Sequence, residues 1–182
     1  GDVYKRQLPN IAEGDELAIN VGSNCYFTSD ISNLTWLPDQ PYTAGGWGYI
    51  GGKAHSTTSE IYNTLDGPIY QTWREGNWSY KIDAPIGEYE IELLIADVTK
   101  PAAQLANLLN KNKEEKHSGE TRFHISICGK QVETNFSPID GGKHRTAFKR
   151  RYIIRNEHDH IVISAGAVKG EPFLAGIKVR KL

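Results

Sequence analysis

Apolar and polar residues alternate most regularly between 88 and 98, where the sequence reads EYEIELLIADV. Apolar side chains take every second position, at Tyr89, Ile91, Leu93 and Ile95. Because successive side chains of a β-strand point to opposite faces, this period predicts a strand with one buried and one solvated face. From Leu94 onward both faces are apolar, which predicts that the end of the strand is buried on both sides.

Shorter segments with the same period predict further strands before and after this one. They cover 16–21, 69–75, 79–83, 122–128, 131–135, 146–155, 160–164 and 175–180. In the 69–75 segment, alternation places Ile69 and Trp73 on one face and Arg74 on the other. Gly129 and Lys130 are suited to a two-residue hairpin turn between two of the later strands.

Between 101 and 116 the spacing of apolar residues changes from two to three and four. These residues are Ala102, Leu105, Ala106, Leu108 and Leu109. Since Pro101 is tolerated in a first turn, the spacing predicts a short amphipathic helix inserted between two strands. Many short strands and no regular alternation of strands with helices predict an all-β chain. We expect an antiparallel β-sandwich of the jelly-roll, galactose-binding-like type.

The segment 36–80 departs from this regular pattern. It holds all four tryptophans, five of the nine tyrosines and many glycines. Glycine and proline favour turns, so we expect loops that display aromatic rings to solvent. An exposed ring offers a flat face to the C–H groups of a sugar, and nearby polar groups bind its hydroxyls. Burial at the end of the core is the more common fate of a single tryptophan, but the density of rings favours a surface site.

The same segment carries a family resemblance. The motifs are NVGS at 20–23 with YFT at 26–28, WLPDQ at 36–40, GWGYIGG at 46–52 and LDGPIYQTWREG at 65–76. Their order and spacing resemble the malectin-like domains, in the bacterial form appended to family 2 glycoside hydrolases of the β-galactosidase type. GEY at 87–89 and GEP at 170–172 continue the pattern. The resemblance covers nearly the whole chain from about Leu17 onward.

The resemblance implies a binding site on loops at one end of the sandwich. Animal malectins bind glucose-containing disaccharide ends there, through several aromatic rings and an aspartate. By motif, Tyr49 keeps one ring, whereas Glu75 stands where the animal pattern has a tyrosine. Thr99 and Lys100 replace a pair of aromatic residues, and Glu171 lies near the position of the aspartate. Each lost ring contact removes about 1 kcal/mol, so we expect a different ligand.

We therefore expect a non-catalytic carbohydrate-binding module of a larger bacterial glycoside hydrolase, which binds oligo- or polysaccharide through aromatic loops. The expected contact residues are Trp47, Tyr49, Trp73 and Arg74, with Tyr42, Trp78 and Glu75 at the rim. The expected partners are a carbohydrate ligand and the catalytic domain of the parent glycosidase. The alternative is a structural accessory domain that packs on that catalytic domain without sugar affinity, because aromatic residues are also enriched at protein interfaces.

Catalytic and metal chemistry find little support in the sequence. Glycoside hydrolysis needs two carboxylates about 5 to 10 Å apart. Asp39, Asp66, Glu75 and Asp97 are available, but no local pattern pairs them, so we expect no catalytic residue. His158 and His160 lack a third zinc ligand and are expected in a turn. We expect no cofactor, since the structural calcium common in carbohydrate-binding sandwiches is not indicated here by a loop of the EF-hand kind.

Charge and cysteine content narrow the class of partner. A net charge of -1 and a pI near 6.7 argue against nucleic acid. The basic run 149–151 is expected on a solvated strand edge. Cys25 and Cys128 show no metal-ligand spacing, and both a disulfide and free thiols stay open at this point. No run of apolar residues is long enough to span a bilayer.

The length of 182 residues predicts one compact domain. Residues 1–7 (GDVYKRQ) resemble a translated adapter sequence, so we expect a non-native leader followed by a malectin-like domain over 8–182. The chain would then be a fragment of a longer protein. For that protein we expect a periplasmic or extracellular location, with a targeting signal outside this fragment.

Overall fold

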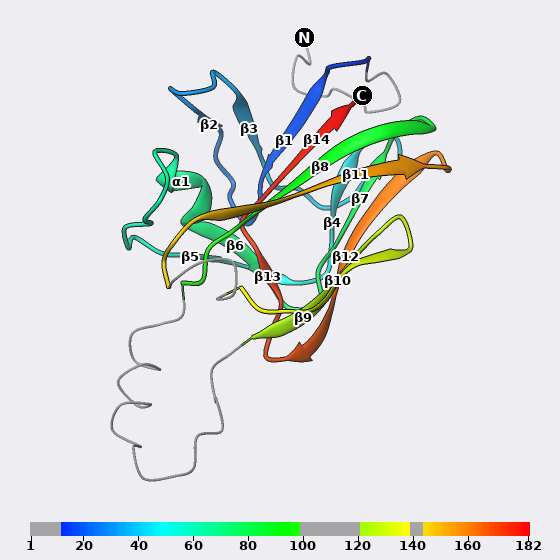
Figure 1. Cartoon of the computed structure of the whole chain (residues 1–182). Coiled ribbons are helices and arrows are strands. Elements are labelled where there is room, and N and C mark those ends of the chain that lie inside the picture. Colours follow the sequence, from blue (N-terminus) through cyan, green and yellow to red (C-terminus); the bar gives the residue numbers. More distant parts are fainter. Residues whose placement is uncertain (1–11, 99–120, 139–143) are drawn as a thin grey trace.

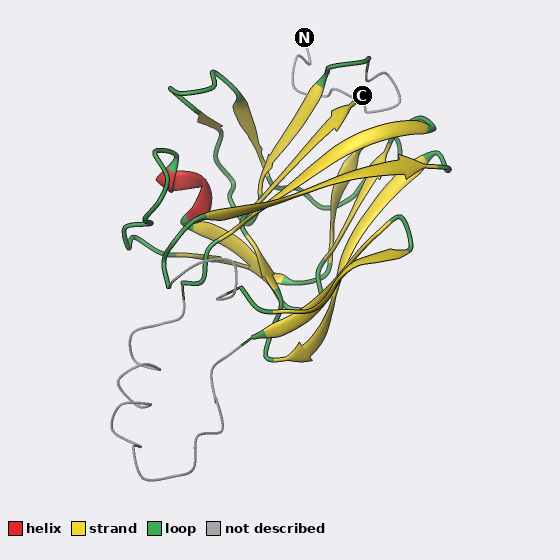
Figure 2. Cartoon of the chain, in the orientation of Figure 1, coloured by secondary structure: helices red, strands yellow, loops and turns green. Residues whose placement is uncertain are grey.

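The computed structural model describes residues 12–98, 121–138 and 144–182 (Figure 1). Nearly every regular element among them is a β-strand, and most strands pair antiparallel (Figure 2). Two large sheets face each other across a common core, which confirms the predicted β-sandwich. The predicted helix over 101–116 lies outside the described residues.

The first sheet has six strands in the order β11-β8-β14-β1-β3-β2. Their bounds are Glu16–Asn20 for β1, Phe27–Thr28 for β2, Thr35–Pro38 for β3, Gly87–Ile95 for β8, Phe148–Asn156 for β11 and Gly176–Lys181 for β14. β1 and β3 pair in parallel, whereas the neighbouring pairs are antiparallel.

The second sheet has five strands in the order β10-β9-β12-β7-β4. Their bounds are Trp47–Ile50 for β4, Ser79–Asp83 for β7, Arg122–Ile127 for β9, Lys130–Phe136 for β10 and His160–Lys169 for β12. A third, smaller sheet joins Lys53–Ser56 (β5), Thr72–Glu75 (β6) and Phe173–Leu174 (β13) in the order β13-β6-β5. The short helix α1 spans Gly67–Tyr70.

The core lies between the two large sheets, as the alternating pattern predicts. The inward side chains of β8 are Tyr89, Ile91, Leu93 and Ile95, all fully buried. The facing sheet contributes Tyr80, Ile82, Ile125, Ile127, Ile161 and Ile163 to the same cluster. Full burial of one such aliphatic side chain stabilises a fold by about 1.5–3 kcal/mol. Leu94 is buried on the opposite face, which confirms that the end of β8 is covered on both sides.

The outer face of the first sheet carries charges of both signs. Glu90 of β8 lies 3.1 Å from Arg180 of β14 and 3.8 Å from Arg151 of β11, measured between nitrogen and oxygen atoms. Glu92 lies 3.7 Å from both Lys149 of β11 and Lys178 of β14. Because β11 is the edge of this sheet, the prediction that the basic run 149–151 lies on a strand edge is confirmed.

Two local predictions are wrong. The strand expected over 69–75 begins only at Thr72, because Pro68 in the first turn of α1 starts a helix that buries Ile69. Arg74, and not Trp73, is therefore the buried residue of β6. The later hairpin turns at 128–129, where Cys128 and Gly129 have φ values of 52° and 77°.

Candidate functional site

The turn formed by Gly51 and Gly52 organises the aromatic segment. It joins β4 to β5, and the two glycines have φ values of 79° and 76°, which residues with a side chain rarely adopt. β4 pairs with β7 in the second sheet, and β5 pairs with β6 in the third. The segment is thus built largely from short strands, which corrects the expectation of open loops. Strand alternation then decides which rings face outward.

Trp47 and Trp78 are buried, which corrects the prediction that rings near residue 47 are displayed to solvent. Trp47 lies opposite Ile82 of β7 and is 4% exposed, and Trp78 is 1% exposed. Gly48 shows the physical reason, since a Cβ at this position would lie 2.3 Å from the backbone of 41–42. The glycine permits close packing of two backbone segments and leaves the neighbouring indole facing the core.

Arg74 forms a buried ion pair with Asp39. The Arg74 Nη2 to Asp39 Oδ2 distance is 3.2 Å, and both side chains are about 95% buried or more, with 6% and 4% exposed. Arg74 Nε also donates to Asp39 Oδ2 at 3.2 Å, and Nη1 donates to the carbonyl of Gly52 at 3.2 Å. The guanidinium carbon lies 3.4 Å from the centroid of the Tyr49 ring. Arg74 therefore supports the turn from inside and covers Tyr49.

Asp39 accepts further hydrogen bonds inside the domain. Its Oδ2 accepts hydrogen bonds from the backbone N–H of Gly22 at 2.7 Å and from the Tyr80 hydroxyl at 2.8 Å. Burial raises the pKa of the Asp39 carboxyl, while the bonds from Gly22, Tyr80 and Arg74 favour the ionised form and limit the rise. Burial and the neighbouring Asp39 carboxylate raise the pKa of Tyr80 well above its ordinary value, so this phenol stays a hydrogen-bond donor.

Trp73 and Glu75 reach the surface together with His55, which the sequence patterns did not single out. His55 of β5 lies opposite Trp73 of β6, and their rings stack with centroids 5.8 Å apart and an interplanar angle of 17°. His55 Nε2 lies 3.0 Å from Glu75 Oε2. The side chains of His55 and Glu75 are 37% and 35% exposed, and Trp73 is half-buried. We name these three residues the Trp73 cluster. The sequence gives little indication of this cluster, because His55 lies in the four-residue run KAHS, which is too short to show the alternation of a strand.

Glu171 lies at the end of β6 that carries Glu75. A Cβ placed on Gly76 would lie 3.5 Å from Glu171 Oε2, and the N–H of Gly76 donates to the carbonyl of Pro172 at 2.9 Å. This is the residue suggested to stand near the position of the family's aspartate. Thr99 and Lys100, the other two positions of the resemblance, lie outside the described residues.

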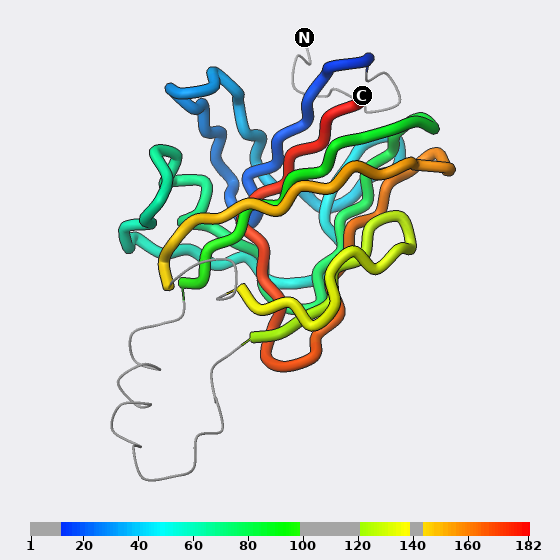
Figure 3. The backbone as a smooth tube through the Cα atoms, viewed as in Figure 1, coloured from blue at the N-terminus to red at the C-terminus, as the bar shows by residue number. Residues whose placement is uncertain are grey.

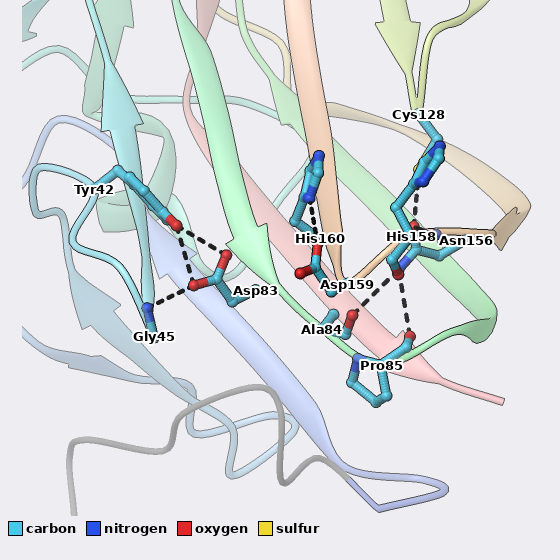
Figure 4. A network of polar contacts seen from close by, with 10 residues as sticks. All are labelled: Tyr42, Gly45, Asp83, Ala84, Pro85, Cys128, Asn156, His158, Asp159 and His160. Atoms are coloured by element: carbon cyan, nitrogen blue, oxygen red, sulfur yellow. Dashed lines mark hydrogen bonds and ion pairs between the residues drawn. The ribbon is translucent and has the colours of Figure 1, made fainter.

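The Tyr42 side chain is held by Asp83, the last residue of β7. Its hydroxyl donates to the carboxylate of Asp83 at 2.9 and 3.0 Å, and the N–H of Gly45 donates to the same carboxylate at 2.6 Å (Figure 4). The ammonium of Lys81 lies 4.9 Å from the centroid of the Tyr42 ring. The Tyr42 hydroxyl and the Gly45 N–H therefore share one carboxylate at the end of β7, and a role of Tyr42 at the rim stays a prediction.

A family model described as Malectin domain matches residues 16–177. The chain belongs to the malectin domain family. The match spans every described strand of the two large sheets except the end of β14. The resemblance predicted from the motifs is thereby confirmed.

Solved structures place this malectin domain among parts of larger proteins. A β-glucuronidase 2 from Bacteroides uniformis is 45% identical with a TM-score of 0.79, over 93% of this chain and 18% of that chain. The ANXUR2 extracellular domain from Arabidopsis thaliana is 15% identical with a TM-score of 0.66, over 91% of this chain and 48% of that chain, which shows the fold alone.

A curated relative gives the same picture of partial coverage. The kinesin-like protein KIN-14E from Oryza sativa subsp. japonica is 28% identical over 136 residues, which are 73% of this chain and 12% of that protein. This malectin domain thus spans less than a fifth of the β-glucuronidase and about an eighth of the kinesin-like protein.

The four carboxylates considered for hydrolysis have separate surroundings in this malectin domain. Asp39 pairs with Arg74, and Glu75 pairs with His55. Asp66 accepts both of its bonds from the Ser29 hydroxyl, at 2.9 and 3.0 Å. Asp97 is buried just beyond the end of β8. Asp39, Glu75 and Asp66 are thus each engaged by a different group.

His158 lies in the turn between β11 and β12, as predicted, whereas His160 is the first residue of β12 (Figure 4). Their rings stack 5.9 Å apart, and His160 Nδ1 lies 2.7 Å from Asp159 Oδ1. The buried Asn156 amide fixes this connection by donating to the carbonyl of His158 at 2.8 Å. In the described part of the chain, no three histidine, cysteine or acidic residues are grouped to hold a metal ion.

Both cysteines are free thiols, which settles the alternative left open by the sequence. Cys25 is exposed, and Cys128 is half-buried at the turn that follows β9. Within 12–98, 121–138 and 144–182, no helix has the length and apolar character needed to cross a membrane.

Proposed function

We propose that this malectin domain is a non-catalytic carbohydrate-binding module of a larger bacterial glycoside hydrolase, located in the periplasm or outside the cell. The observation that carries the proposal is the Trp73 cluster, where two stacked rings and a carboxylate share one partly exposed face. Aromatic rings bind the C–H face of a sugar, and the carboxylate of Glu75 accepts hydrogen bonds from its hydroxyls. The likeness to a segment of a glycosidase supports the same proposal.

The proposed contact residues are fewer than the sequence suggested. Trp73, His55 and Glu75 form the centre, and Glu171 lies beside Gly76, which follows β6. Tyr49 is not included, because Arg74 covers its ring. Arg74 acts as a positioning residue, because its donors are directed to Asp39 and to the Gly51–Gly52 turn. A site with so few rings is consistent with weak binding that gains strength when the parent enzyme holds several modules on one polysaccharide.

Titration of the full chain with a panel of plant and host oligosaccharides tests this function. We expect binding in the millimolar range or tighter, and a loss of about tenfold or more after Trp73→Ala, since one stacking contact contributes about 1 kcal/mol beyond its buried area. Because Trp73 also packs against the core, His55→Ala serves as a second variant. Tyr26→Ala, which removes an exposed ring near β2, is the control. An equal loss of saccharide affinity in all three variants would contradict the proposal.

A structural accessory domain is the second proposed function. Burial of Trp47 and Trp78 favours it, because these rings stabilise the sandwich and leave fewer for a ligand. In that case the domain packs on the catalytic domain of the parent glycosidase through exposed apolar side chains. Absence of any saccharide binding at millimolar concentration, together with loss of parent-enzyme stability when the domain is deleted, would select this function.

A further inference from the structure

Tyr62 and Arg145 meet where β8 ends and β11 begins. The N–H of Tyr62 donates to the carbonyl of Arg145 at 2.7 Å, and the N–H of Ala147 donates to the carbonyl of Tyr62 at 2.9 Å. These bonds form an isolated parallel bridge between Tyr62 and Thr146. The N–H of Arg145 donates to the carbonyl of Asp97 at 2.7 Å. Three segments distant in sequence are thus fixed side by side (Figure 3).

The backbone at this junction is strained. Arg145 has a φ of 51°, in the left-handed region that a residue with a long side chain seldom adopts. Asn63, beside Tyr62, has a φ of 64°, and its amide donates to the carbonyl of Ala147 at 3.1 Å. Such conformations persist where the surrounding structure enforces them, and they are concentrated at ligand-binding sites. The bridge holds the Arg145 and Tyr62 side chains in a fixed relation.

The guanidinium of Arg145 is electrostatically unusual in this domain. Arginines that pair with a carboxylate are Arg74, Arg150, Arg151, Arg155 and Arg180. Arg145 has no carboxylate within ion-pair distance among the described residues. Its Nη2 donates to the Tyr62 hydroxyl at 3.2 Å, and its central carbon lies 5.3 Å from the centroid of that ring. The remaining N–H donors of the guanidinium are left for a ligand or for water.

We propose that Tyr62 and Arg145 form a subsite for an acidic sugar, meaning a pyranose that carries a carboxylate or a sulfate. The planar guanidinium presents N–H donors to two oxygens of such an anion. Tyr62 is an exposed residue, and its ring offers an apolar face beside the guanidinium for the C–H groups of the same sugar. A neutral sugar offers the guanidinium no counterion, so the subsite binds an acidic sugar more tightly than a neutral one.

This subsite shares no residue with the Trp73 cluster. Glu75 places a carboxylate in that cluster, where it disfavours an anionic ligand. Arg145, which meets no carboxylate in the described part of the chain, places a cation at the proposed subsite. The two surfaces therefore prefer ligands of different charge. An experiment can thus contradict the proposed acidic-sugar subsite without contradicting the proposed function of the Trp73 cluster, and the reverse.

The test is a nuclear magnetic resonance titration of the full chain with three probes. They are an oligosaccharide containing β-linked glucuronate, its carboxyl-reduced neutral counterpart, and the neutral oligosaccharide bearing one sulfate group. We expect the glucuronate probe to bind at millimolar concentration or below, and to bind about tenfold more tightly than the reduced probe, because a charge-assisted bidentate contact is lost on reduction. If the sulfated probe binds as tightly as the glucuronate probe, the subsite recognises negative charge in general. If it binds more weakly, the subsite is selective for a carboxylate.

Arg145→Asn isolates the guanidinium, because asparagine tolerates the left-handed backbone at this position. The variant should bind the glucuronate probe about as weakly as the wild type binds the reduced probe. Arg155→Asn removes the same charge from an exposed arginine at the other end of β11 and should leave binding unchanged.

Equal affinity for the glucuronate and reduced probes would overturn the proposal. So would equal effects of Arg145→Asn and Arg155→Asn, or no binding of either anionic probe at millimolar concentration. The comparison of probes on the wild-type chain requires no variant, so it stands even if Arg145→Asn does not fold.

Discussion

The guanidinium of Arg74 lies over the ring of Tyr49, with its central carbon 3.4 Å from the ring centroid. Two residues that sequence motifs assign to a ligand site therefore contact each other inside the domain. At its edge the same guanidinium donates to Asp39 through Nε and lies 3.2 Å from it through Nη2, while Nη1 donates to the carbonyl of Gly52. These contacts fix the Gly51–Gly52 turn, which leads into β5 and its His55.

The Arg74–Asp39 pair should be a major contribution to stability. Asp39→Asn leaves a buried guanidinium without its counterion, so we expect the free energy of unfolding to fall by about 3–5 kcal/mol. Denaturant unfolding followed by tryptophan fluorescence measures this change. Glu157→Gln removes the same charge from an exposed pair with Arg155 and should cost about 0.5 kcal/mol or less. If the free energy of unfolding falls by a similar amount in the two variants, the buried pair does not contribute more to stability than the exposed one.

Gly48 should not tolerate a side chain. A Cβ there would lie 2.3 Å from backbone atoms of Pro41 and Tyr42, which cannot move without separating 41–42 from β4. We expect Gly48→Ala to lower the free energy of unfolding by about 1–3 kcal/mol or more. Gly46→Ala is the matched control, since its Cβ would meet only the Thr43 carbonyl at 3.4 Å. A thermal unfolding midpoint that is equal in the two variants would contradict this packing.

Stability should fall in alkali because of Tyr89. Burial raises the pKa of this phenol to about 12, whereas in the unfolded chain it ionises near its ordinary value of 10. A raised folded pKa gives a contribution that is complete below pH 10 and is lost as the pH rises toward 12. The loss should be smaller than the roughly 3 kcal/mol that two pKa units correspond to, because solvent screens part of the interaction.

Denaturant unfolding at about pH 9 and about pH 11 tests the Tyr89 prediction. The fall between the two conditions should become smaller in Tyr89→Phe, which has no phenol to ionise. The variant loses the hydrogen bond from the Tyr89 hydroxyl to the Pro85 carbonyl, so we expect it to be less stable by about 1 kcal/mol at the lower pH. If the free energy of unfolding falls between the two pH values by the same amount in Tyr89→Phe as in the wild type, groups other than Tyr89 cause the fall.

The charges on the outer face of the first sheet should make stability depend on salt. Glu90 pairs with both Arg180 and Arg151, so Glu90→Gln should lower the free energy of unfolding by about 1 kcal/mol at low ionic strength. At about 1 M salt the difference should shrink, because the Debye length is then about 3 Å. A difference that does not change with salt would point to lost packing in place of lost charge.

The regular strands could be predicted well because each carries its own pattern. β7 spans Ser79–Asp83, as the alternation predicted, and the inward residues of β8 are those with period two. β3, β4 and β5 in the aromatic segment were missed because each is only four residues long. Four residues cannot display a period, so only pairing with β7 and β6 defines β4 and β5.

The sequence by itself determined that this chain is a β-sandwich of the malectin family, because alternation and motif order are local properties that each segment carries. Only the tertiary structure decided which aromatic rings face water. Trp47 and Trp73 look alike in the sequence, but β4 turns one toward the core while β6 leaves the other half-exposed beside His55. The physical reason is that a strand has two faces, and which face is buried depends on the sheet it joins and on what packs against it.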